Sequence, residues 1–290
     1  MNRSKSFLGV LYIGKKKFLG CIEKHLDNDF ILVRIINIAF PHKSCIKIAC
    51  SSDFTPLQYS LQSNELETLI KNLKESMILS SKTVKKAFCY VDRKHFISKD
   101  PYCDSSPDLL EGKYDVCIST PRVHVLVAEL LLKNLSFANL CLDVGSGSGF
   151  FTVLMQVLAP QSQVYGIDYH ADLIDQSKLV LEQHYPSELE KIYFIKGDGK
   201  NGIEGKIFDV IHVGFMCDTI PIQLLKQLSV GGRMLLPLSS EQKCSFDDRC
   251  LSGKYLCIDK VNEKDTIVTE LFSCFFVPDA CNNSVDRKVG

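Results

Sequence analysis

The segment LDVGSGSG at residues 142–149 constrains the fold of this chain more than any other feature. It lies between an apolar run, Leu140–Val144, and a helical pattern that begins at Phe150. Its three alternate glycines allow the backbone to turn tightly against a ligand, because glycine adopts conformations that other residues avoid. The segment therefore predicts a strand, a glycine-rich loop and a helix that together bind a nucleotide-like cofactor.

Strand and helix patterns alternate on both sides of this segment. Apolar runs of strand length occur at Gln163–Ile167, Ile192–Ile195, Phe208–Val213 and Arg233–Leu238, with a helical pattern at Ile220–Leu228. Such alternation indicates a parallel sheet with helices on both faces. Two further strands are expected within residues 254–278, after a polar loop. We therefore predict an α/β fold with a doubly wound, mostly parallel sheet and an antiparallel C-terminal strand.

Helical periodicity also precedes the glycine segment. Asn64 and Glu67 have the spacing of a capping box, and a second helix is expected to begin near Ser81. Pro121 opens a third predicted helix, Arg122–Asn134, because proline is favoured in the first turn.

The spacing of the glycines distinguishes between two kinds of cofactor. A nicotinamide-binding loop reads G-x-G-x-x-G, and its third glycine falls on Phe150 or, in the other frame, on Thr152. The observed G-x-G-x-G, preceded by Asp143 at the strand end, is instead typical of methyltransferases that use S-adenosyl-L-methionine. The prediction is therefore a Rossmann-like class I methyltransferase domain.

Acidic residues end the next two strands as well. Asp168 is placed to accept hydrogen bonds from ribose hydroxyls, and Asp198 from an adenine amino group, with Gly199 leaving room for the ring. Each aspartate alone also fits the N-cap of a helix. Together with the glycine loop they predict one cofactor site at the carboxyl edge of the sheet. The predicted contacts are Asp143, Gly145, Ser146, Gly147, Ser148, Gly149, Asp168, Asp198 and Gly199.

Several blocks over about residues 63–280 resemble the protein-L-isoaspartate (D-aspartate) O-methyltransferase family. These blocks are DRKHF at 92–96, PYCDS at 101–105, ISTPRVH at 118–124, GID at 166–168, GDG at 197–199, FDVIHVG at 208–214 and GGRMLLPL at 231–238, besides the glycine segment. The ISTPRVH block is the most specific. The resemblance implies methyl transfer from S-adenosyl-L-methionine to the α-carboxylate of L-isoaspartyl and D-aspartyl residues in damaged proteins, as the first step of their repair.

The resemblance also implies roles for individual residues. Ser119 corresponds to the family's active-site serine, within a cofactor-contacting segment formed by Ile118, Ser119, Thr120 and Pro121. His124, about one helical turn after Ser119, is an expected substrate-binding residue. Arg122 departs from the family, which has a histidine there, and is expected to bind a substrate carboxylate by its own charge. Without the family, Ser119 also fits a helix N-cap, Arg122 a solvated side chain and His124 a core or surface histidine.

Some positions depart from the family pattern. Cys117 stands where a threonine is usual, Phe215 and Met216 replace small residues, and Ala280 replaces a hydroxyl contact. The segment 102–119 is about three residues longer than usual. Two alternatives therefore stay open: a methyltransferase of the same fold with another acceptor, and a non-catalytic adaptor that binds the cofactor.

Composition excludes several other classes of protein. Lys+Arg and Asp+Glu both number 34, and a chain without net charge lacks the basic excess that nucleic-acid binding requires. No run approaches the roughly 18 apolar residues of a membrane helix, and Lys15–Lys17 end the apolar stretch at Phe7–Gly14 too early for a signal peptide. The 13 cysteines are odd in number and contain no C-x-x-C pair, which indicates free thiols in a reducing compartment and no metal site. We expect a cytoplasmic protein, and the family resemblance implies a monomer.

The chain divides into three parts. Residues 1–60 contain strand-like runs at Phe30–Ile38 and Cys45–Ala49, which fit either a small β appendage or an incidental extension. Residues 61–280 form the expected methyltransferase domain, and residues 281–290 are a polar tail.

Overall fold

The computed structural model describes residues 5–13, 16–24, 26–27, 30–34, 45–48, 65–243 and 249–279. Side chains are described from residue 65 onward, except at 241–243. Asn64, Ala280 and the polar tail at 281–290 therefore lie outside the described residues, and so does the capping role expected of Asn64.

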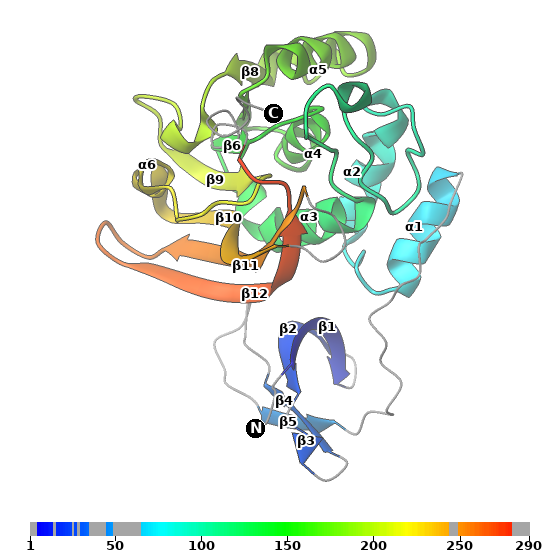
Figure 1. Cartoon of the computed structure of the whole chain (residues 1–290), viewed down its shortest axis with the longest axis vertical. Helices are drawn as coiled ribbons and strands as arrows, with labels where there is room; N and C mark the ends of the chain where they lie inside the picture. The colour runs from blue at the N-terminus through cyan, green and yellow to red at the C-terminus, as the bar shows by residue number, and fades with distance from the viewer. Residues whose placement is uncertain are drawn as a thin grey trace, which may run out of the picture.

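A seven-stranded sheet forms the centre of the molecule (Figure 1), in the order β12-β11-β10-β9-β6-β7-β8. In the order β8-β7-β6-β9-β10 each strand pairs parallel with the next, whereas β11 pairs antiparallel with both β10 and β12. The predicted mostly parallel sheet with an antiparallel C-terminal strand is thus confirmed. The strands are β6 (Leu140–Val144), β7 (Gln163–Asp168), β8 (Ile192–Lys196), β9 (Phe208–Val213), β10 (Leu228–Lys243), β11 (Leu251–Lys260) and β12 (Thr266–Phe276).

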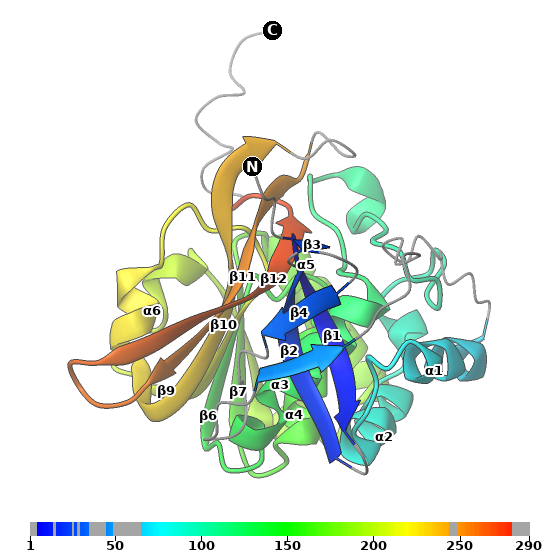
Figure 2. The same ribbon diagram turned by 90° about the horizontal axis from the view of Figure 1, so that it is seen from below.

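Helices cover both faces of this sheet, as Figure 2 shows with α6 on one side and α2, α3 and α4 on the other. The side chains of α1 to α5 form one buried cluster with the sheet, and α6 packs into the cluster on the opposite face. The helices are α1 (Leu66–Glu75), α2 (Lys82–Tyr90), α3 (Pro121–Leu135), α4 (Phe150–Leu158), α5 (Ala171–His184) and α6 (Ile222–Lys226).

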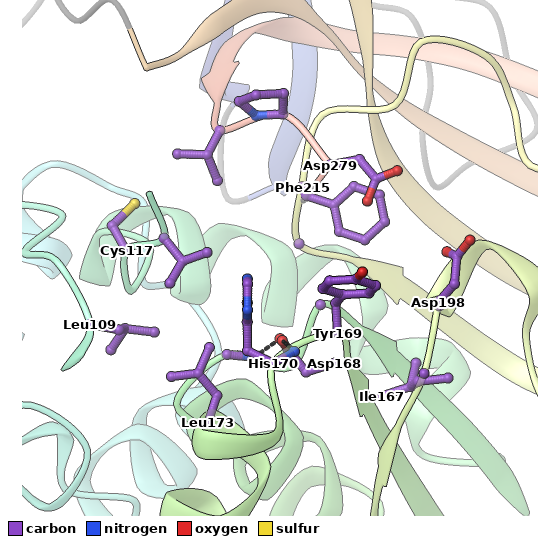
Figure 3. A pocket seen from close by; sticks show the side chains of 18 residues that line it. Leu109, Cys117, Ile167, Asp168, Tyr169, His170, Leu173, Asp198, Phe215 and Asp279 are labelled. Carbon is purple, nitrogen blue, oxygen red and sulfur yellow. Dashed lines mark hydrogen bonds between the residues drawn. The ribbon is translucent and has the colours of Figure 1, made fainter. Parts of the chain in front are cut away.

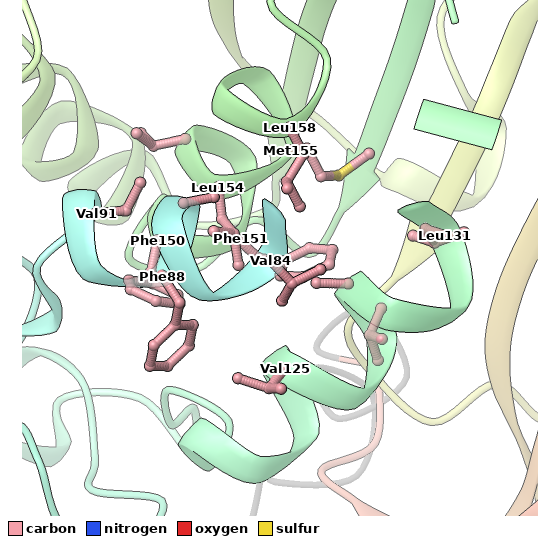
Figure 4. Packing of buried hydrophobic residues seen from close by; sticks show 14 of the residues in the cluster. Val84, Phe88, Val91, Val125, Leu131, Phe150, Phe151, Leu154, Met155 and Leu158 are labelled. Atoms are coloured by element: carbon pink, nitrogen blue, oxygen red, sulfur yellow. The ribbon is translucent and has the colours of Figure 1, made fainter. Parts of the chain in front are cut away.

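Buried apolar side chains from α2, α3 and α4 pack against one another (Figure 4). Phe88 of α2 meets Phe150, the first residue of α4, with ring centroids 5.6 Å apart in an edge-to-face contact. Val84 and Val125 from α2 and α3 complete this contact, and all of these side chains are buried. Because Phe150 directly follows the last glycine of the loop, its burial fixes where the loop ends.

The short strands β1 to β5 precede α1 in the chain. β1 (Lys5–Ile13) and β2 (Lys16–Lys24) form an antiparallel pair, and β3 (Leu26–Asp27), β4 (Phe30–Arg34) and β5 (Cys45–Ile48) form a second antiparallel sheet. β4 and β5 fall within the two strand-like runs of the sequence, and the remaining residues of those runs, 35–38 and 49, lie outside the described residues. That residues 1–60 are a separate appendage stays a prediction. Within the described part of the chain, no helix has the length and apolar character needed to cross a bilayer.

Candidate functional site

A cavity lies at the carboxyl ends of β6, β7, β8 and β9 (Figure 3), where open α/β sheets bind their ligands. Counted together with the open solvent at its mouth, the space in this hollow is about 570 Å³. Two segments distant in sequence close it: the loop that precedes α3, and Val277 to Asp279 after β12. Asp168, Asp198 and Gly199 at the predicted strand ends therefore line one hollow, and its use as a cofactor site stays a prediction.

The glycine loop forms the floor of this cavity. Gly145, Gly147 and Gly149 have φ of +74°, +53° and +81°, a left-handed conformation that disfavours side chains. Gly145 and Gly147 line the cavity, whereas Gly149 begins α4. Ser146 and Ser148 are buried and do not line it, so a contact of either side chain with a cofactor stays a prediction.

Asp168 ends β7 and lines the cavity beside the glycine loop. Its carboxylate accepts hydrogen bonds from the backbone N–H groups of Gly147 (2.9 Å) and His170 (3.0 Å). Burial raises the pKa of this carboxyl group above its ordinary value. These two bonds hold the carboxylate at the cavity wall, where its remaining acceptor positions are available to ligand hydroxyls.

Asp198 and Gly199 line the cavity at the end of β8. The Asp198 carboxylate accepts from the N–H of Lys200 (3.0 Å), so it also caps a single 3₁₀ turn, Gly199–Asn201. A β-carbon at Gly199 would lie 2.4 Å from Val144 Cγ1. Asp198 therefore both caps the turn and lines the cavity. Position 199 requires glycine because a side chain there would collide with Val144.

Asp143 is the one predicted aspartate that does not line the cavity. It is only 1% exposed, and its two oxygens accept from the Thr152 hydroxyl (2.6 Å) and contact His212 Nδ1 (2.7 Å). Asp143 thereby ties β6 to α4 and β9 beneath the glycine loop. Its position supports the loop from below.

Cys117 lines the cavity, whereas the segment Ile118–Pro121 directly after it does not. Thr120, not Ser119, caps α3: its hydroxyl accepts from the N–H of Val123 (3.3 Å). The N-cap interpretation of Ser119 is therefore wrong. Ser119 is half-buried, forms no hydrogen bond with another described residue and does not line the cavity, so its contact with a substrate stays a prediction.

The side chains of Arg122 and His124 contact other side chains of this chain. The Arg122 guanidinium pairs with the Asp104 carboxylate through Nε (2.8 Å) and Nη2 (2.7 Å). His124 is buried, with Nδ1 3.2 Å from Arg93 Nη1. Burial and the Arg93 charge hold the pKa of His124 well below 6.5, so the imidazole is neutral. Neither side chain lines the cavity.

Several cavity residues were not predicted from the sequence. Tyr169 and His170 directly follow Asp168, so the rule that ligands bind at strand ends had already indicated their neighbourhood. Phe215 lies over the glycine loop, since a β-carbon on Gly145 would be 2.7 Å from its Cδ1. The others come from distant segments, and no local pattern marks them: Leu109, Val116, Val277, Pro278 and Asp279.

The chain is similar in sequence to known proteins. A family model described as protein-L-isoaspartate(D-aspartate) O-methyltransferase matches residues 64–284. A protein-L-isoaspartate O-methyltransferase of Caenorhabditis elegans is 31% identical over 200 residues, covering 68% of this chain and 84% of the relative. Protein-L-isoaspartate O-methyltransferase 1 of Arabidopsis thaliana is 32% identical over 184 residues, covering 61% and 79%.

A solved structure agrees with these relatives. It is that of a candidate protein-L-isoaspartate O-methyltransferase from Plasmodium falciparum in complex with S-adenosyl-L-homocysteine. The two chains are 27% identical and superpose with a TM-score of 0.66, over 75% of this chain and 99% of the other.

Proposed function

The chain belongs to the protein-L-isoaspartate (D-aspartate) O-methyltransferase family, and on this basis we propose what it does. It transfers a methyl group from S-adenosyl-L-methionine to the α-carboxylate of L-isoaspartyl and D-aspartyl residues in damaged proteins, which starts their repair. The observation that carries this proposal is the family match across residues 64–284, which spans the whole cavity.

For this reaction the protein mainly has to align the substrate carboxylate with the methyl group and to exclude water from the site. The substrate carboxylate is ionised at neutral pH, so no general base has to remove a proton. The cofactor supplies the methyl group on a sulfonium cation, and the transfer to a carboxylate oxygen cancels both charges. Water stabilises the separated charges, so a site that excludes water and aligns the two groups accelerates the reaction.

The residues at the strand ends fit the cofactor. We propose that Asp168 accepts hydrogen bonds from the ribose hydroxyls, since its carboxylate is held at the cavity wall by two backbone N–H groups. Asp198 accepts from the adenine amino group, with Gly199 leaving room for the ring. Gly145 and Gly147 let the backbone approach the cofactor closely, and Asp143 supports them.

The acceptor side centres on Ser119. We propose that its hydroxyl donates a hydrogen bond to the substrate carboxylate and orients it without consuming a proton. Arg122 and His124 then act on the substrate indirectly. Arg122 fixes Asp104 and His124 contacts Arg93, and both pairs hold the chain around Ser119.

A methylation assay with paired peptides tests the proposal. The full chain is incubated with methyl-labelled S-adenosyl-L-methionine and two peptides that differ only in an isoaspartyl or a normal aspartyl linkage. Base-labile methyl ester on the isoaspartyl peptide alone is the expected result. Esterification of both peptides would indicate another acceptor, and cofactor binding without transfer would indicate an adaptor.

We further propose that the enzyme acts as a monomer in the cytoplasm. The odd number of cysteines supports a reducing compartment, and the eight cysteines whose side chains the structure describes are all without disulfides. Light scattering after size exclusion tests the monomer, for which a mass near 32.6 kDa is expected.

A further inference from the structure

The loop at residues 107–118, which we call the lid, covers one side of the cofactor cavity. It is a small hairpin: the N–H of Ile118 donates to Pro107 O (3.1 Å), and that of Leu109 to Val116 O (3.0 Å). Leu109 is only 2% exposed, and its Cδ1 lies 3.4 Å from where a β-carbon of Gly147 would be. The lid therefore rests directly on the glycine loop.

Four residues, which we call the clasp, join the tip of the lid to the start of α5. Tyr114 stacks on His170 with ring centroids 3.9 Å apart and planes at 21°. The Tyr114 hydroxyl donates to Asp172 Oδ2 (3.2 Å), and Lys113 forms an ion pair with the same carboxylate. The clasp thus consists of Lys113, Tyr114, His170 and Asp172.

The clasp is directly connected to the ribose site. His170 lines the cavity, and its N–H donates to the Asp168 carboxylate (3.0 Å). The residue that holds the lid therefore also holds the proposed ribose acceptor. Displacement of the lid from His170 would change the cavity wall beside Asp168.

The closed position of the lid depends on these contacts, because its own backbone is strained. Leu110, Glu111 and Gly112 have φ of +49°, +54° and +79° in succession, and the first two carry side chains that disfavour this conformation. On the other side, Asp108 pairs with Arg249 at 2.6 Å, and both side chains are 40% exposed. Buried Leu109 anchors the base of the lid. At its tip exposed ion pairs contribute little to stability, so the stack of Tyr114 on His170 is the principal restraint there.

We propose that the lid opens to admit and release the cofactor, and that Tyr114 is the positioning residue that holds it closed. This inference rests on the proposed function only in taking the cavity as the cofactor site. It concerns how long the ligand stays bound, and the acceptor plays no part in it.

Dissociation of S-adenosyl-L-homocysteine, measured by surface plasmon resonance on the immobilised full chain, tests the lid. Tyr114→Ala is expected to accelerate dissociation about 3- to 10-fold, the loss of one aromatic stack. Tyr114→Phe keeps the stack and should change the rate less than about 2-fold. Asp172→Asn weakens the ion pair at an exposed side chain that the fold does not need, and should accelerate dissociation about 2-fold.

Tyr193→Ala is the matched control. Tyr193 also stacks on an aromatic ring, Tyr165 (4.9 Å, 18°), donates its hydroxyl to Glu190 O (3.2 Å) and is 39% exposed. It lies at the start of β8, at the opposite end of the strand from the cavity. Its loss should leave dissociation unchanged.

Two results would contradict the lid proposal. One is an unchanged dissociation rate in both Tyr114→Ala and Asp172→Asn, and the other is an acceleration by Tyr193→Ala equal to that by Tyr114→Ala. Circular dichroism identifies a variant that has not folded, in which case Asp172→Asn alone decides. Failure of the proposed function has a different signature. The unchanged chain would then leave the isoaspartyl peptide unmethylated, while Tyr114→Ala would still release S-adenosyl-L-homocysteine faster.

Discussion

Gly145 is the residue where the backbone and a neighbouring side chain both require glycine. Its φ of +74° is unfavourable for other residues, and an added β-carbon would meet Phe215 at 2.7 Å. We expect Gly145→Ala to lower the free energy of unfolding by about 1–2 kcal/mol from the backbone alone. Because Phe215 must also move within the cavity, the affinity for S-adenosyl-L-homocysteine, measured by titration calorimetry, should fall about tenfold or more.

Gly205→Ala is the control for this change. Gly205 has the same φ of +74°, and no atom lies within 4 Å of its added β-carbon. It carries the same backbone penalty without the collision, so its cofactor affinity should be unchanged. Equal affinities in the two variants would show that Phe215 does not confine Gly145.

Ser119 and Thr120 are adjacent hydroxyls with opposite expected roles. Thr120 caps α3, so Thr120→Ala should lower the free energy of unfolding by about 1 kcal/mol. Ser119→Ala should leave stability and S-adenosyl-L-homocysteine affinity nearly intact while lowering kcat about 10- to 100-fold, the usual effect of one hydrogen bond to a charged group. Urea denaturation and steady-state kinetics on both variants make the comparison. A loss of stability in Ser119→Ala equal to that in Thr120→Ala would assign Ser119 a structural role.

Between elements, Glu129 joins α3 to the start of α2. Its carboxylate accepts from the N–H of Ser80 (2.7 Å), the N–H of Ser81 (2.6 Å) and the Ser80 hydroxyl (2.8 Å). We expect Glu129→Ala to lower the free energy of unfolding by about 1–2 kcal/mol, because three polar groups lose a charged acceptor at a partly exposed site. Urea denaturation measures it, with Glu182→Ala on the exposed face of α5 as the control. A change no larger than that of the control would contradict the capping role.

The elements that depend on local chemistry were the ones the sequence could predict. The helix expected near Ser81 begins at Lys82, and the Ser81 hydroxyl caps it by accepting from Thr83 N–H (3.1 Å), a signal that involves only neighbouring residues. The predicted strand Arg233–Leu238 is instead part of β10, which begins at Leu228 and shortens the predicted helix Ile220–Leu228 to α6. Pairing with β9 extends this strand back across the glycine pair, where the register shifts, and pairing with β11 extends it forward to Lys243. Such pairing depends on distant partners that no local pattern contains.

At the scale of the whole molecule, the site too combines residues that local patterns predict with residues that only the fold brings together. The glycine loop, Asp168 and Asp198 follow from strand ends at one sheet edge, and the cavity confirms that they lie together. Leu109 and Asp279 reach that cavity from segments far apart in the sequence. Only the packed fold brings them together, so their part in the site could not be predicted from residue types or spacing.

Acid stability is a property of the whole molecule, because two histidines are held neutral within the fold. Burial, with the charge of Arg93, lowers the pKa of His124 well below 6.5. Burial, with stacked His184 at 3.9 Å, lowers the pKa of His95. The unfolded chain therefore binds more protons than the folded one at any pH between the lowered values and 6.5. The free energy of unfolding then rises with pH through this window and is lost as the pH falls below about 6.5.

We accordingly expect the unfolding free energy, from urea denaturation at pH 7.5 to 5, to decrease below about pH 6.5. The slope from buried His124 should approach about 1.4 kcal/mol per pH unit, and partly exposed His95 should add less. In His124→Asn the amide oxygen can still accept from Arg93, but nothing titrates, so the slope should flatten by about one histidine's share. Asp168, whose pKa is raised, acts with the opposite sign, because its folded form binds the extra proton. An unchanged slope in His124→Asn would mean that His124 binds its proton as readily in the fold as in the unfolded chain.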